Sequence, residues 1–459
     1  MNGVTFEQIL RWTEADLVGI FDSGRQPAEI SSDTRTIADG DLFLALQGAR
    51  LDGHEYVVEA FAKGAAAAVV ERQWQLRNRA TVPGPLFVVD SALQALGSLA
   101  RNYRKQFDIP VIAIVGSSGK TTAKELTAAV LGTRYRVLKS VENENNEIGI
   151  PMALLRLSEQ HEVAVLEFGT RKFGDIAYLC SLAQPTAGVL LIIGRAHLEF
   201  FESVEGVAKA KGELLDYLGE SSLTLVNVDD CVAAREAMRT KGRLLGFSID
   251  RESQFRGEGL VLDREGRGHF SLQNYDIEVG VAGRHNVYNA LVAAALGREF
   301  GVDWGNVCEA ISAFHPIEMR TQVLRKGENR IINDSYNANP ESMRAALTLL
   351  RDMGSAEGRM IAVLGDMLEL GNASADLHAD IGRFAAAIGI DMLFCTGQMT
   401  RQTITAALES GMEPENVRHF CSRSELRESL SGCLGNADVV LVKGSRGMEL
   451  EQVVQALLN

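Results

Sequence analysis

The sequence lacks long apolar segments and paired cysteines. Its longest apolar runs, such as residues 188–194, fall far short of the roughly 18 residues that a membrane-spanning helix needs. The six cysteines are scattered, with no Cys-x-x-Cys pair and no histidine at metal-ligand spacing, so we expect buried thiols in a reducing compartment. No basic segment followed by an apolar one stands near the first residue, as a secretory signal would require. We therefore predict a cytoplasmic protein without membrane insertion.

Positive charge is also in short supply. Lys and Arg number 46 against 60 Asp and Glu, which gives a formal net charge of −14. A surface of this average sign repels a nucleic-acid backbone, so we expect no nucleic-acid partner. Local Arg, Lys and helix N-termini can still bind an anionic small molecule. The remaining composition, 46% hydrophobic and 23% charged with only 9 Pro, is that of an ordinary globular protein.

The chain is too long for a single hydrophobic core and predicts three domains of α/β class. Short β-rich runs alternate with helical patterns, which favours parallel βαβ units. Residues 255–282 are Gly-rich with short alternating strands, so we expect an antiparallel ribbon added to the central sheet. The predicted domains are a small mixed α/β domain (1–107), a central P-loop-type parallel sheet with the added antiparallel strands (108–315) and a Rossmann-like domain (316–459). The strands expected in the last two are 111–115, 163–168, 189–193, 223–228, 330–334, 360–364, 391–395 and 439–442.

A glycine-rich turn follows the buried run 111–115 and precedes a helical pattern. Glycines let backbone N–H groups converge on phosphate oxygens, and the helix N-terminus adds partial positive charge. Lys120 is placed to reach the β- and γ-phosphates, and the Thr121 hydroxyl to bind Mg²⁺. Ile114 stands where a full Walker motif has its first Gly, so this is the shorter GxxGKT form. The predicted phosphate-binding residues are Gly116, Ser117, Ser118, Gly119, Lys120, Thr121 and Thr122.

The turn alone fits hydrolases, kinases and ligases alike, but it resembles that of the Mur ligase family, the amide-forming enzymes of bacterial cell-wall precursor synthesis. Further stretches are similar to family motifs in the family's order, from about residue 5 to the C-terminus. Four look like the member that adds D-alanyl-D-alanine: 143–151, 334–343, 364–371 with His378, and 442–446. Ser32–Arg35, Gly40–Phe43 and Asp52–His54 resemble the family's uridine-nucleotide domain.

The resemblance implies an ATP-dependent carboxylate–amine ligase. Its expected substrates are UDP-N-acetylmuramoyl-tripeptide and D-alanyl-D-alanine, joined through an acyl phosphate to give a pentapeptide precursor, ADP and phosphate. ATP and two Mg²⁺ ions are the expected cofactors, and a monomer is the expected state. Three alternatives stay open: another ligase of the superfamily with a different acceptor or amine, a P-loop NTPase or kinase, and a nucleotide-binding scaffold that has lost catalysis.

Candidate metal ligands come partly from the residues and partly from the resemblance. Glu167 ends a buried strand, where a carboxylate is costly unless it is paired or bound to metal, and in P-loop proteins a neighbouring strand end carries the Mg²⁺ carboxylate. The resemblance adds His197, and it implies that Lys211 is modified by CO₂ to a carbamate that ligates Mg²⁺. The predicted metal set is therefore Thr121, Glu167, His197 and Lys211, and the predicted catalytic set is Lys120, Glu167, His197 and Lys211.

The remaining substrate contacts are implied by resemblance. For the nucleotide they are His285, Asn286, Asn289, Arg320 and Asp334; Asn286 would also serve as the N-cap of the helix that follows. For the uridine substrate they are Ser32, Asp33, Thr34, Arg35, Asp52, Gly53, His54, Asn143, Asn145 and Asn146. For the amine substrate they are Tyr336, Asn337, Asn339, Lys443, Ser445 and Arg446.

The chain departs from the family pattern at four places. Leu191-Ile192 replaces residues that are usually polar, Glu142 a usual Gly, Glu144 a usual apolar residue, and Met319-Arg320 a usual Gly-Arg. Two apolar side chains at 191–192 cannot hydrogen-bond a metal-bound water or a phosphate. The departures put two things in question: the shape of the Asn-rich loop, and the groups that would hydrogen-bond to water or phosphate on the second Mg²⁺. They do not affect the predicted metal ligands.

Overall fold

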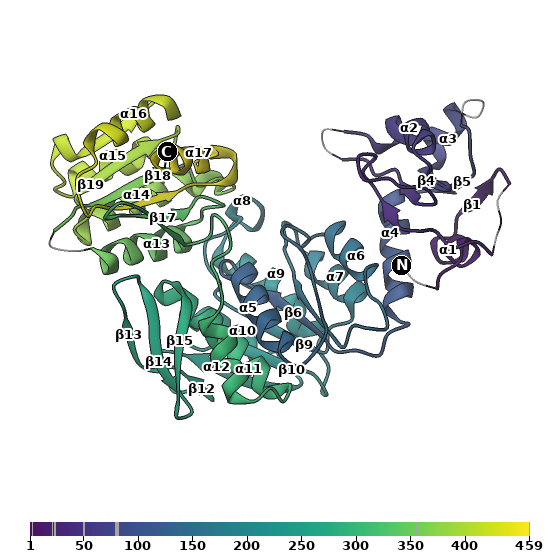
Figure 1. The fold of residues 1–459 in the computed structure, drawn as a ribbon, viewed down its shortest axis with the longest axis horizontal. Coiled ribbons are helices and arrows are strands. Elements are labelled where there is room, and N and C mark those ends of the chain that lie inside the picture. Colours follow the sequence, from purple (N-terminus) through teal and green to yellow (C-terminus); the bar gives the residue numbers. More distant parts are fainter. Residues whose placement is uncertain are drawn as a thin grey trace. The chain divides into compact units, whose positions relative to one another are not determined.

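The computed structural model describes residues 1–459 except 2, 21, 23, 49–50, 79–81, 355–356 and 459. The chain divides into two compact units, and Figure 1 labels their helices and strands. The first comprises residues 1–113, 135–169 and 175–186, and the second comprises 114–134, 170–174 and 187–459. Within the described residues, no helix has both the length and the apolar character needed to cross a membrane. The boundaries of the three predicted domains stay a prediction.

The first unit opens with a five-stranded sheet in the order β1-β5-β4-β3-β2. Its strands are parallel except β1, which pairs antiparallel with β5. Apolar side chains of the strands and of the α2 helix form its core, among them Phe43, Val57, Ala68 and Val88. The elements are α1 (Phe6–Thr13), β1 (Asp16–Val18), β2 (Ile30–Ser31), β3 (Leu42–Leu44), η1 (Gly53–Tyr56), α2 (Val57–Ala62), β4 (Ala67–Glu71), α3 (Arg72–Arg77), β5 (Leu86–Val89) and α4 (Ala92–Arg104).

The same unit also holds a parallel strand pair and two helices. β7 (Val137–Lys139) pairs with β8 (Val163–Glu167), and Glu167 is the last residue of its strand. α6 (Gly149–Leu154) and α7 (Asp175–Ala183) both pack against α4. The Asn-rich loop, residues 141–148, therefore lies between β7 and α6.

The second unit begins with parallel strands and the helices that follow them. β9, β10, β11 and β12 are parallel neighbours, and Leu191 N–H donates to the Val115 carbonyl at the end of β6 (3.0 Å). α5 packs against α11. The bounds are β6 (Val111–Val115), α5 (Lys120–Gly132), β9 (Ala187–Leu190), α8 (Leu198–Phe201), α9 (Val204–Tyr217), β10 (Leu223–Asn227), α10 (Cys231–Ala237), β11 (Arg243–Ser248), β12 (Phe255–Arg256), α11 (Arg284–Glu299) and α12 (Trp304–Ser312).

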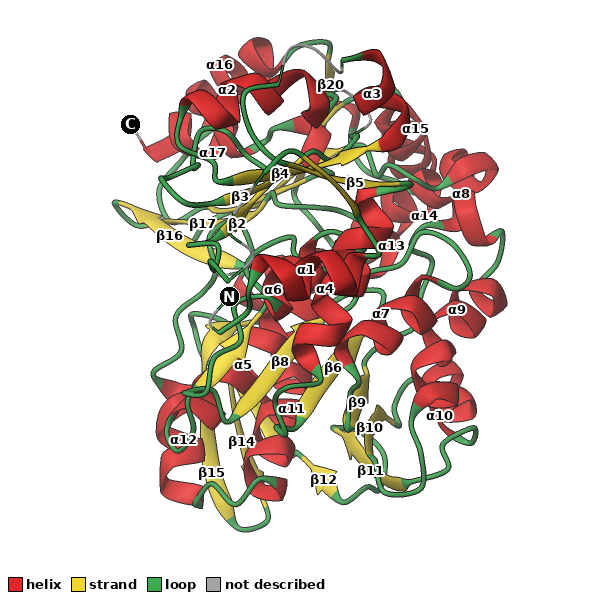
Figure 2. Cartoon of the chain, turned by 90° about the vertical axis from the view of Figure 1, so that its right-hand side faces the viewer, coloured by secondary structure: helices red, strands yellow, loops and turns green. Residues whose placement is uncertain are grey.

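Residues 258–282 form a separate antiparallel sheet of β13 (Glu258–Leu262), β14 (Arg267–Leu272) and β15 (Tyr275–Ala282). α12 packs on β15 (Figure 2). The antiparallel ribbon predicted for 255–282 is thus present, but only β12 joins the parallel strands and the rest makes a sheet of its own. The expectation that the ribbon is added to the central sheet is wrong for β13–β15, which form their own sheet; α11 packs against β14 and β15, and α12 against β15.

The last part of the second unit is a doubly wound sheet in the order β16-β17-β21-β18-β19-β20. Only β16 is antiparallel. Successive strand residues alternate between two cores: α13, α14 and α15 cover one face, and α16 and α17 cover the other. The bounds are β16 (Gln322–Lys326), β17 (Asn329–Asp334), α13 (Pro340–Met353), β18 (Met360–Gly365), η2 (Gly371–Ala373), α14 (Ser374–Ala387), β19 (Met392–Thr396), α15 (Thr400–Glu409), η3 (Pro414–Asn416), β20 (Val417–Phe420), α16 (Arg423–Cys433), β21 (Val439–Lys443), η4 (Arg446–Met448) and α17 (Glu451–Leu458).

The predicted α/β class with parallel sheets and additional antiparallel strands is confirmed. In open parallel sheets of this kind, the loops at the carboxyl ends of the strands form the ligand site. Those loops carry most of the predicted functional residues in the second unit.

Candidate active site

The phosphate turn is shaped by its own residues and backed by a neighbouring helix. Gly119 precedes α5 in the left-handed region (φ +83°), and a Cβ placed on it would lie 2.8 Å from Asn289 Oδ1. Only glycine fits this combination of backbone angle and close approach without strain. Lys120 Nζ folds back to donate to the Gly116 carbonyl at 3.0 Å. The N-terminus of α5 and the Lys120 ammonium thus gather positive charge at one turn, an arrangement typical of anion binding.

Two buried asparagines of α11 support this turn. Asn286 Nδ2 donates to the Ala282 carbonyl (2.7 Å), and Asn289 Nδ2 donates to Asn286 Oδ1 (2.8 Å). Each side chain is about 3% exposed. The predicted N-cap role of Asn286 is wrong, because Gly283 (φ +103°) occupies the cap and Asn286 lies inside the first turn. Their predicted contact with the nucleotide stays a prediction.

Ser117 ties the turn to the loop that follows β9. Its backbone N–H donates to the Ile192 carbonyl (2.7 Å), and its Oγ accepts from Gly194 N–H (2.9 Å). The Ser117 amide is therefore hydrogen-bonded within the protein, and the phosphate contact predicted for Ser117 stays a prediction. A Cβ on Gly116 would lie 2.8 Å from Leu191 Cβ. Leu191 and Ile192 thus serve by packing and by a main-chain carbonyl, which explains how two apolar residues fit here.

Helix α13 begins against both of these loops. Asn339 caps the helix in a capping box with Ser342, and Pro340 takes the first helical position, a placement that its fixed φ favours. The cap leaves the Asn339 amide to donate to the Ser117 carbonyl at 3.1 Å. Glu341 Oε1 accepts from Arg195 N–H at 2.9 Å. Residues more than 140 positions away in sequence therefore contact the phosphate turn and the β9–α8 loop through main-chain atoms.

His197 lies at the end of the β9–α8 loop. Its backbone is left-handed (φ +57°) and its side chain is about one-quarter exposed. Nδ1 lies 2.6 Å from Glu369 Oε2. This hydrogen bond is the main cause that lowers the pKa of Glu369 below its ordinary value, so the carboxylate accepts and the imidazole Nδ1–H donates.

Two strand ends meet at the carboxyl edge of the last sheet. Asp334 and Lys443 are paired across β17 and β21, and Lys443 Nζ donates to Asp334 Oδ2 at 2.5 Å and to the Asn337 carbonyl at 2.9 Å. Thr321 N–H donates to Asp334 Oδ1 (2.9 Å), and Thr321 Oγ1 lies 3.2 Å from His285 Nε2. Burial lowers the pKa of His285. The Lys443 ammonium is buried and bonded within the protein, and its predicted contact with the dipeptide carboxylate stays a prediction.

The other residues predicted to contact the nucleotide or the amine lie around this edge. The Arg320 guanidinium stacks over the Tyr336 ring at 3.8 Å. Met319 has φ +60°, which gives a physical reason why the family usually has Gly there. Ser445 Oγ accepts from Leu368 N–H, Arg446 donates to Glu451, and Asn337 Oδ1 accepts from Ala338 N–H.

The predicted metal ligands are divided between the two units. Thr121, His197 and Lys211 belong to the second, and Glu167 to the first. Thr121 and Lys211 are buried, at 6% and 2% exposure. The described residues contain no group of three or more His, Cys, Asp or Glu side chains able to hold a metal ion. An unmodified lysine cannot supply the oxygen ligand that Mg²⁺ prefers, whereas a carbamate on Lys211 can, so the donor chemistry fits Mg²⁺ only with that modification.

In the first unit, Glu167 and the Asn-rich loop are linked. Glu167 is 4% exposed, and its Oε1 accepts from Asn145 Nδ2 at 3.0 Å. Asn146 Oδ1 accepts from Gly149 N–H at 2.9 Å at the start of α6, while Asn143 is exposed. Glu144, one of the family departures, forms a bidentate pair with Arg156, and Glu142, another, has φ +38°.

The residues predicted for the uridine nucleotide fall into two groups. Asp33 holds Arg35 in a bidentate pair, which is the main cause that lowers the pKa of Asp33 to about 2; Ser32 is exposed beside them and Thr34 is buried. His54 is 3% exposed; Nδ1 bonds Asp52 (2.6 Å) and Nε2 accepts from Glu71 N–H (3.0 Å). A Cβ on Gly53 would lie 2.7 Å from the Leu46 carbonyl. Asp52–His54 therefore brace the fold, and a substrate contact through the His54 ring nitrogens would break one of these bonds.

Comparison with known proteins decides the family. Three family models match in order: "Mur ligase family, catalytic domain" over residues 28–112, "Mur ligase middle domain" over 114–297, and "Mur ligase, glutamate ligase domain" over 319–446. The chain belongs to the Mur ligase family. The family predicted from the motifs is thereby confirmed, and the chain is a ligase.

Curated relatives of this Mur ligase carry one name. The UDP-N-acetylmuramoyl-tripeptide–D-alanyl-D-alanine ligase of Escherichia coli is 35% identical and covers 97% of the chain and 98% of the relative. The enzyme of the same name from Bacillus subtilis is 34% identical, with 94% and 93% covered. Among solved structures, MurF from Acinetobacter baumannii matches with a TM-score of 0.88 at 30% identity over 99% and 98% of the two chains. MurF from Thermotoga maritima in complex with ADP matches at 0.82 and 27%, over 94% and 97%.

Some residues of the site were not predicted from the sequence of this Mur ligase. Glu341 and Glu369 lie in stretches that resemble family motifs, yet no role was assigned to them. Asp230 Oδ2 accepts from Ile193 N–H at 2.9 Å, and Lys124, on α5 four residues after Lys120, is fully buried beside Glu125. Lys124 follows Lys120 by four positions, which places both on one side of α5, and this spacing was the local feature that could have identified it. The others act across long sequence separations and leave no periodic pattern.

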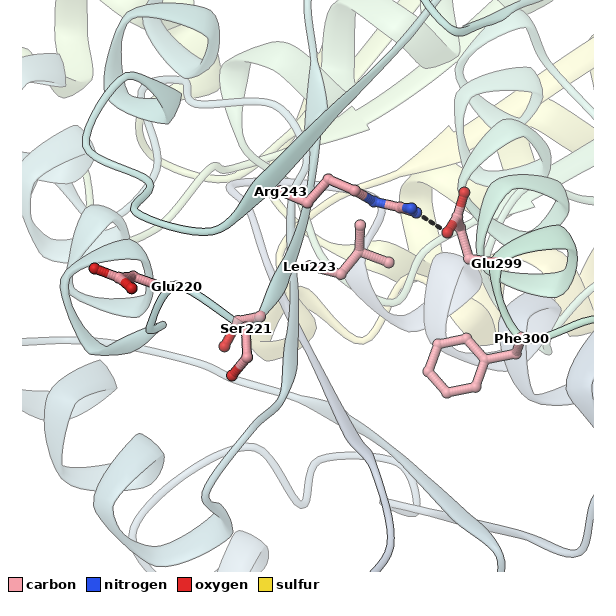
Figure 3. Close-up of a pocket in the computed structure, with 7 residues that line it drawn as sticks. Glu220, Ser221, Leu223, Arg243, Glu299 and Phe300 are labelled. Carbon is pink, nitrogen blue, oxygen red and sulfur yellow. Dashed lines mark ion pairs between the residues drawn. The ribbon is translucent and has the colours of Figure 1, made fainter.

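A surface hollow of about 350 Å³ lies elsewhere in the second unit. Figure 3 shows its lining and the ion pair between Arg243 and Glu299. None of the predicted site residues lines it; the lining residues are Glu220, Ser221, Ser222, Leu223, Arg243, Glu299 and Phe300. It therefore contributes nothing to the candidate active site.

Proposed function

We propose that this Mur ligase joins D-alanyl-D-alanine to UDP-N-acetylmuramoyl-tripeptide, using ATP and releasing ADP and phosphate. The observation that carries the proposal is the extent of the similarity. At 35% identity, 97% of the chain aligns with 98% of the Escherichia coli enzyme of that name. The similarity therefore includes the uridine-nucleotide stretches, the phosphate turn and the Asp334–Asn339 stretch, not the ATP-binding part alone.

The phosphate turn supplies the ATP end of the reaction. Amide formation from a free carboxylate is uphill, so the tripeptide carboxylate first attacks the γ-phosphate to give an acyl phosphate and ADP. Lys120 and the N-terminus of α5 stabilise the negative charge that accumulates on the transferred group. The Asn286–Asn289 pair packs behind Gly119 and supports the turn. Across these described residues, the pair does so without a hydrogen bond to a backbone N–H of the turn.

The metal ligands in this proposal are Thr121, Glu167, His197 and a carbamate on Lys211, for two Mg²⁺ ions. When bound, Mg²⁺ neutralises phosphate charge and orients the γ-phosphate for in-line attack. Lys211 is 2% exposed on α9, and a desolvated lysine amine can lose its proton and react with CO₂ to give a carbamate. Glu167 is held by Asn145, so its carboxylate orientation is fixed before any ligand arrives.

The amine substrate binds at the carboxyl edge of the last sheet. Tyr336, Asn337, Asn339, Ser445 and Arg446 lie on the loops that follow β17 and β21. The amine attacks the acyl carbon, phosphate leaves, and the amide forms. Lys443 completes the proposed amine contacts, and its ion pair with Asp334 also fixes the two strand ends that carry these loops. His285, Asn286, Asn289, Arg320 and Asp334 complete the nucleotide site of the proposal, and the uridine contacts stay those predicted above.

The setting of the reaction is also part of the proposal. The two substrates, ATP and Mg²⁺ are small molecules of the cytoplasm, where we place the enzyme as a monomer without a nucleic-acid partner. Two of the structures that match at 16% identity, a MurC and a folylpolyglutamate synthase, share the fold alone and do not argue for their substrates.

The test is a reconstituted reaction. Purified protein is mixed with UDP-N-acetylmuramoyl-tripeptide, D-alanyl-D-alanine, ATP and Mg²⁺ between about pH 7 and 9, and the pentapeptide is detected by mass. ADP should appear only when both substrates are present. ADP formation without an amine would indicate an NTPase, a product with another amine would indicate a different ligase, and no ADP under any condition would indicate a scaffold.

A further inference from the structure

The carboxylate of Glu369 connects two loops of the ATP-binding part of the molecule. It lies on the turn between β18 and η2, and its Oε2 is 2.6 Å from His197 Nδ1. Its other oxygen, Oε1, is 3.3 Å from a guanidinium nitrogen of Arg171. Its main-chain carbonyl accepts from Glu199 N–H at 3.2 Å. Glu369, on the turn after β18, therefore contacts Arg171 in the loop after β8 and His197 in the loop after β9.

The turn that carries Glu369 is held firmly. Met367 N–H donates to His378 Nε2 (3.0 Å) and Leu368 N–H donates to Ser445 Oγ (2.9 Å). Gly371 (φ +55°) approaches so closely that a Cβ on it would lie 3.1 Å from Glu199 Cα. Contacts before Glu369 in the sequence (Met367 and Leu368) and after it (Gly371) therefore fix the position of its carboxylate beside the β9–α8 loop.

This geometry selects one form of the His197 ring. A carboxylate only accepts hydrogen bonds, so Nδ1 carries the proton and the neutral ring keeps its lone pair on Nε2. Metal-binding histidines are commonly oriented in this way, by a carboxylate that accepts from the nitrogen opposite the metal, and loss of such a partner costs 10–100-fold in metal affinity or activity. The sequence motifs do not predict this contact, because Glu369 and His197 are 172 positions apart.

We infer that Glu369 is a positioning residue that orients His197 for metal binding and makes metal affinity depend on the docking of the last sheet. The inference rests on the proposed role of His197 as a Mg²⁺ ligand. Glu369 itself is not a ligand in this scheme, because its two oxygens are taken by His197 and Arg171. Its effect passes through the imidazole.

The experiment measures Mn²⁺ binding to the full-length protein with a non-hydrolysable ATP analogue, through the electron paramagnetic resonance signal of free Mn²⁺. We expect Glu369→Ala to weaken Mn²⁺ binding by about 10–100-fold. Glu369→Gln, whose side-chain oxygen can still accept from Nδ1–H, should retain most of the affinity. Asp380→Asn is the matched control, because Asp380 pairs with Arg195 (3.6 Å) of the same loop but does not contact His197. It should leave Mn²⁺ affinity unchanged.

A double-mutant cycle separates this inference from the proposed function. If Glu369 acts through His197, Glu369→Ala should add nothing in a His197→Ala background. An equal loss in Glu369→Ala and Asp380→Asn, or additive losses in the double variant, would overturn the inference and leave the metal role of His197 standing. If His197→Ala itself binds Mn²⁺ as tightly as the parent, the proposed metal role fails instead. Thermal unfolding of every variant shows whether a loss of binding reflects misfolding.

Discussion

Two loops at the carboxyl ends of β6 and β9 are shaped in different ways. The phosphate turn after β6 takes its form chiefly from its own glycines, and distant residues, Asn289 of α11 and Asn339 of α13, contact it from outside. The loop after β9 takes its form from distant residues, chiefly Asp230, Glu341 and Glu369. A loop that encodes its own shape can be recognised from sequence, whereas one shaped by partners in another part of the chain cannot.

The largest effect is expected from removal of the Lys120 ammonium from the phosphate turn. Lys120→Ala should lower the rate of ADP formation by at least about 100-fold, because a charge aimed at the transferring phosphoryl group is lost. A coupled ADP assay with both substrates measures the effect. Lys241→Ala removes an exposed lysine and should keep the parent rate. A Lys120→Ala enzyme with near-normal turnover would show that the turn is not the phosphate site.

The next test asks whether the turn really encodes its own shape. Gly119→Ala should lower the free energy of unfolding by about 1–2 kcal/mol, since alanine resists the left-handed backbone, and its Cβ would also press on Asn289. Urea unfolding gives the stability and calorimetry the nucleotide affinity. Gly132→Ala in the same helix meets nothing within 4 Å and should instead stabilise by up to about 1 kcal/mol. Equal effects of the two changes would argue against a special backbone at Gly119.

A third test concerns the distant support given by α13. Asn339→Ala should cost about 1 kcal/mol of stability through loss of the helix cap. Asn339→Ser keeps an oxygen that accepts from Ser342 N–H but removes the amide that donates to the Ser117 carbonyl. Urea unfolding should place the Ser variant between the parent and Ala. If Ser is as destabilised as Ala, the contact to the phosphate turn outweighs the cap.

A smaller effect is expected from pH on the turn that carries Glu369. Burial lowers the pKa of His378 below its ordinary value, and its neutral ring accepts from Met367 N–H. The unfolded chain, with a His pKa of about 6.5, then binds more protons than the folded one, so stability is full above that pH and falls as the pH drops below it. Unfolding free energies measured from pH 7.5 to 5.5 should show this decline. The slope should be shallower in His378→Gln, and an unchanged slope would contradict the assignment.

The smallest effect concerns the Asn-rich loop of the other unit. Glu142 has a positive φ of 38° where the family usually has Gly. Glu142→Gly should stabilise by about 0.5 kcal/mol, as relief of the left-handed strain exceeds the added chain entropy. Glu147→Gly is the control: Glu147 is exposed, has no positive φ, and should be destabilised. Thermal unfolding of both variants decides whether the departure at Glu142 is a strained position.

Much of the fold could be predicted because buried strands form continuous apolar runs. The strands around 331, 361, 393 and 440 alternate between two buried faces, and the sequence shows them clearly. β16 and β20 were missed because most of their residues are partly or fully exposed. The antiparallel ribbon was predicted but placed in the wrong sheet, since strand alternation does not tell which edge a strand joins.

The site divides in the same way. The glycines, Lys120 and Thr121 of the turn are identified by residue type and spacing alone. Leu191 and Ile192 looked incompatible with the site because side-chain type was the criterion, while one acts by packing on Gly116 and the other through its carbonyl. The ion pair of Lys443 could not be predicted because its partner Asp334 lies 109 positions away. Contacts between main-chain atoms and distant side chains leave no trace in local sequence.

The start of α13 has a consequence for how such enzymes diversify. Asn339 contacts the Ser117 carbonyl, which every residue would offer, and Glu341 contacts the Arg195 amide, which every residue except proline would offer. A joint made to main-chain atoms places few demands on the side chains of the receiving surface; the exception is Gly194, where a Cβ would lie 2.2 Å from Glu341 Cδ. A C-terminal part with another amine pocket, but the same helix start, could thus be recombined with this ATP-binding part without redesign of the joint.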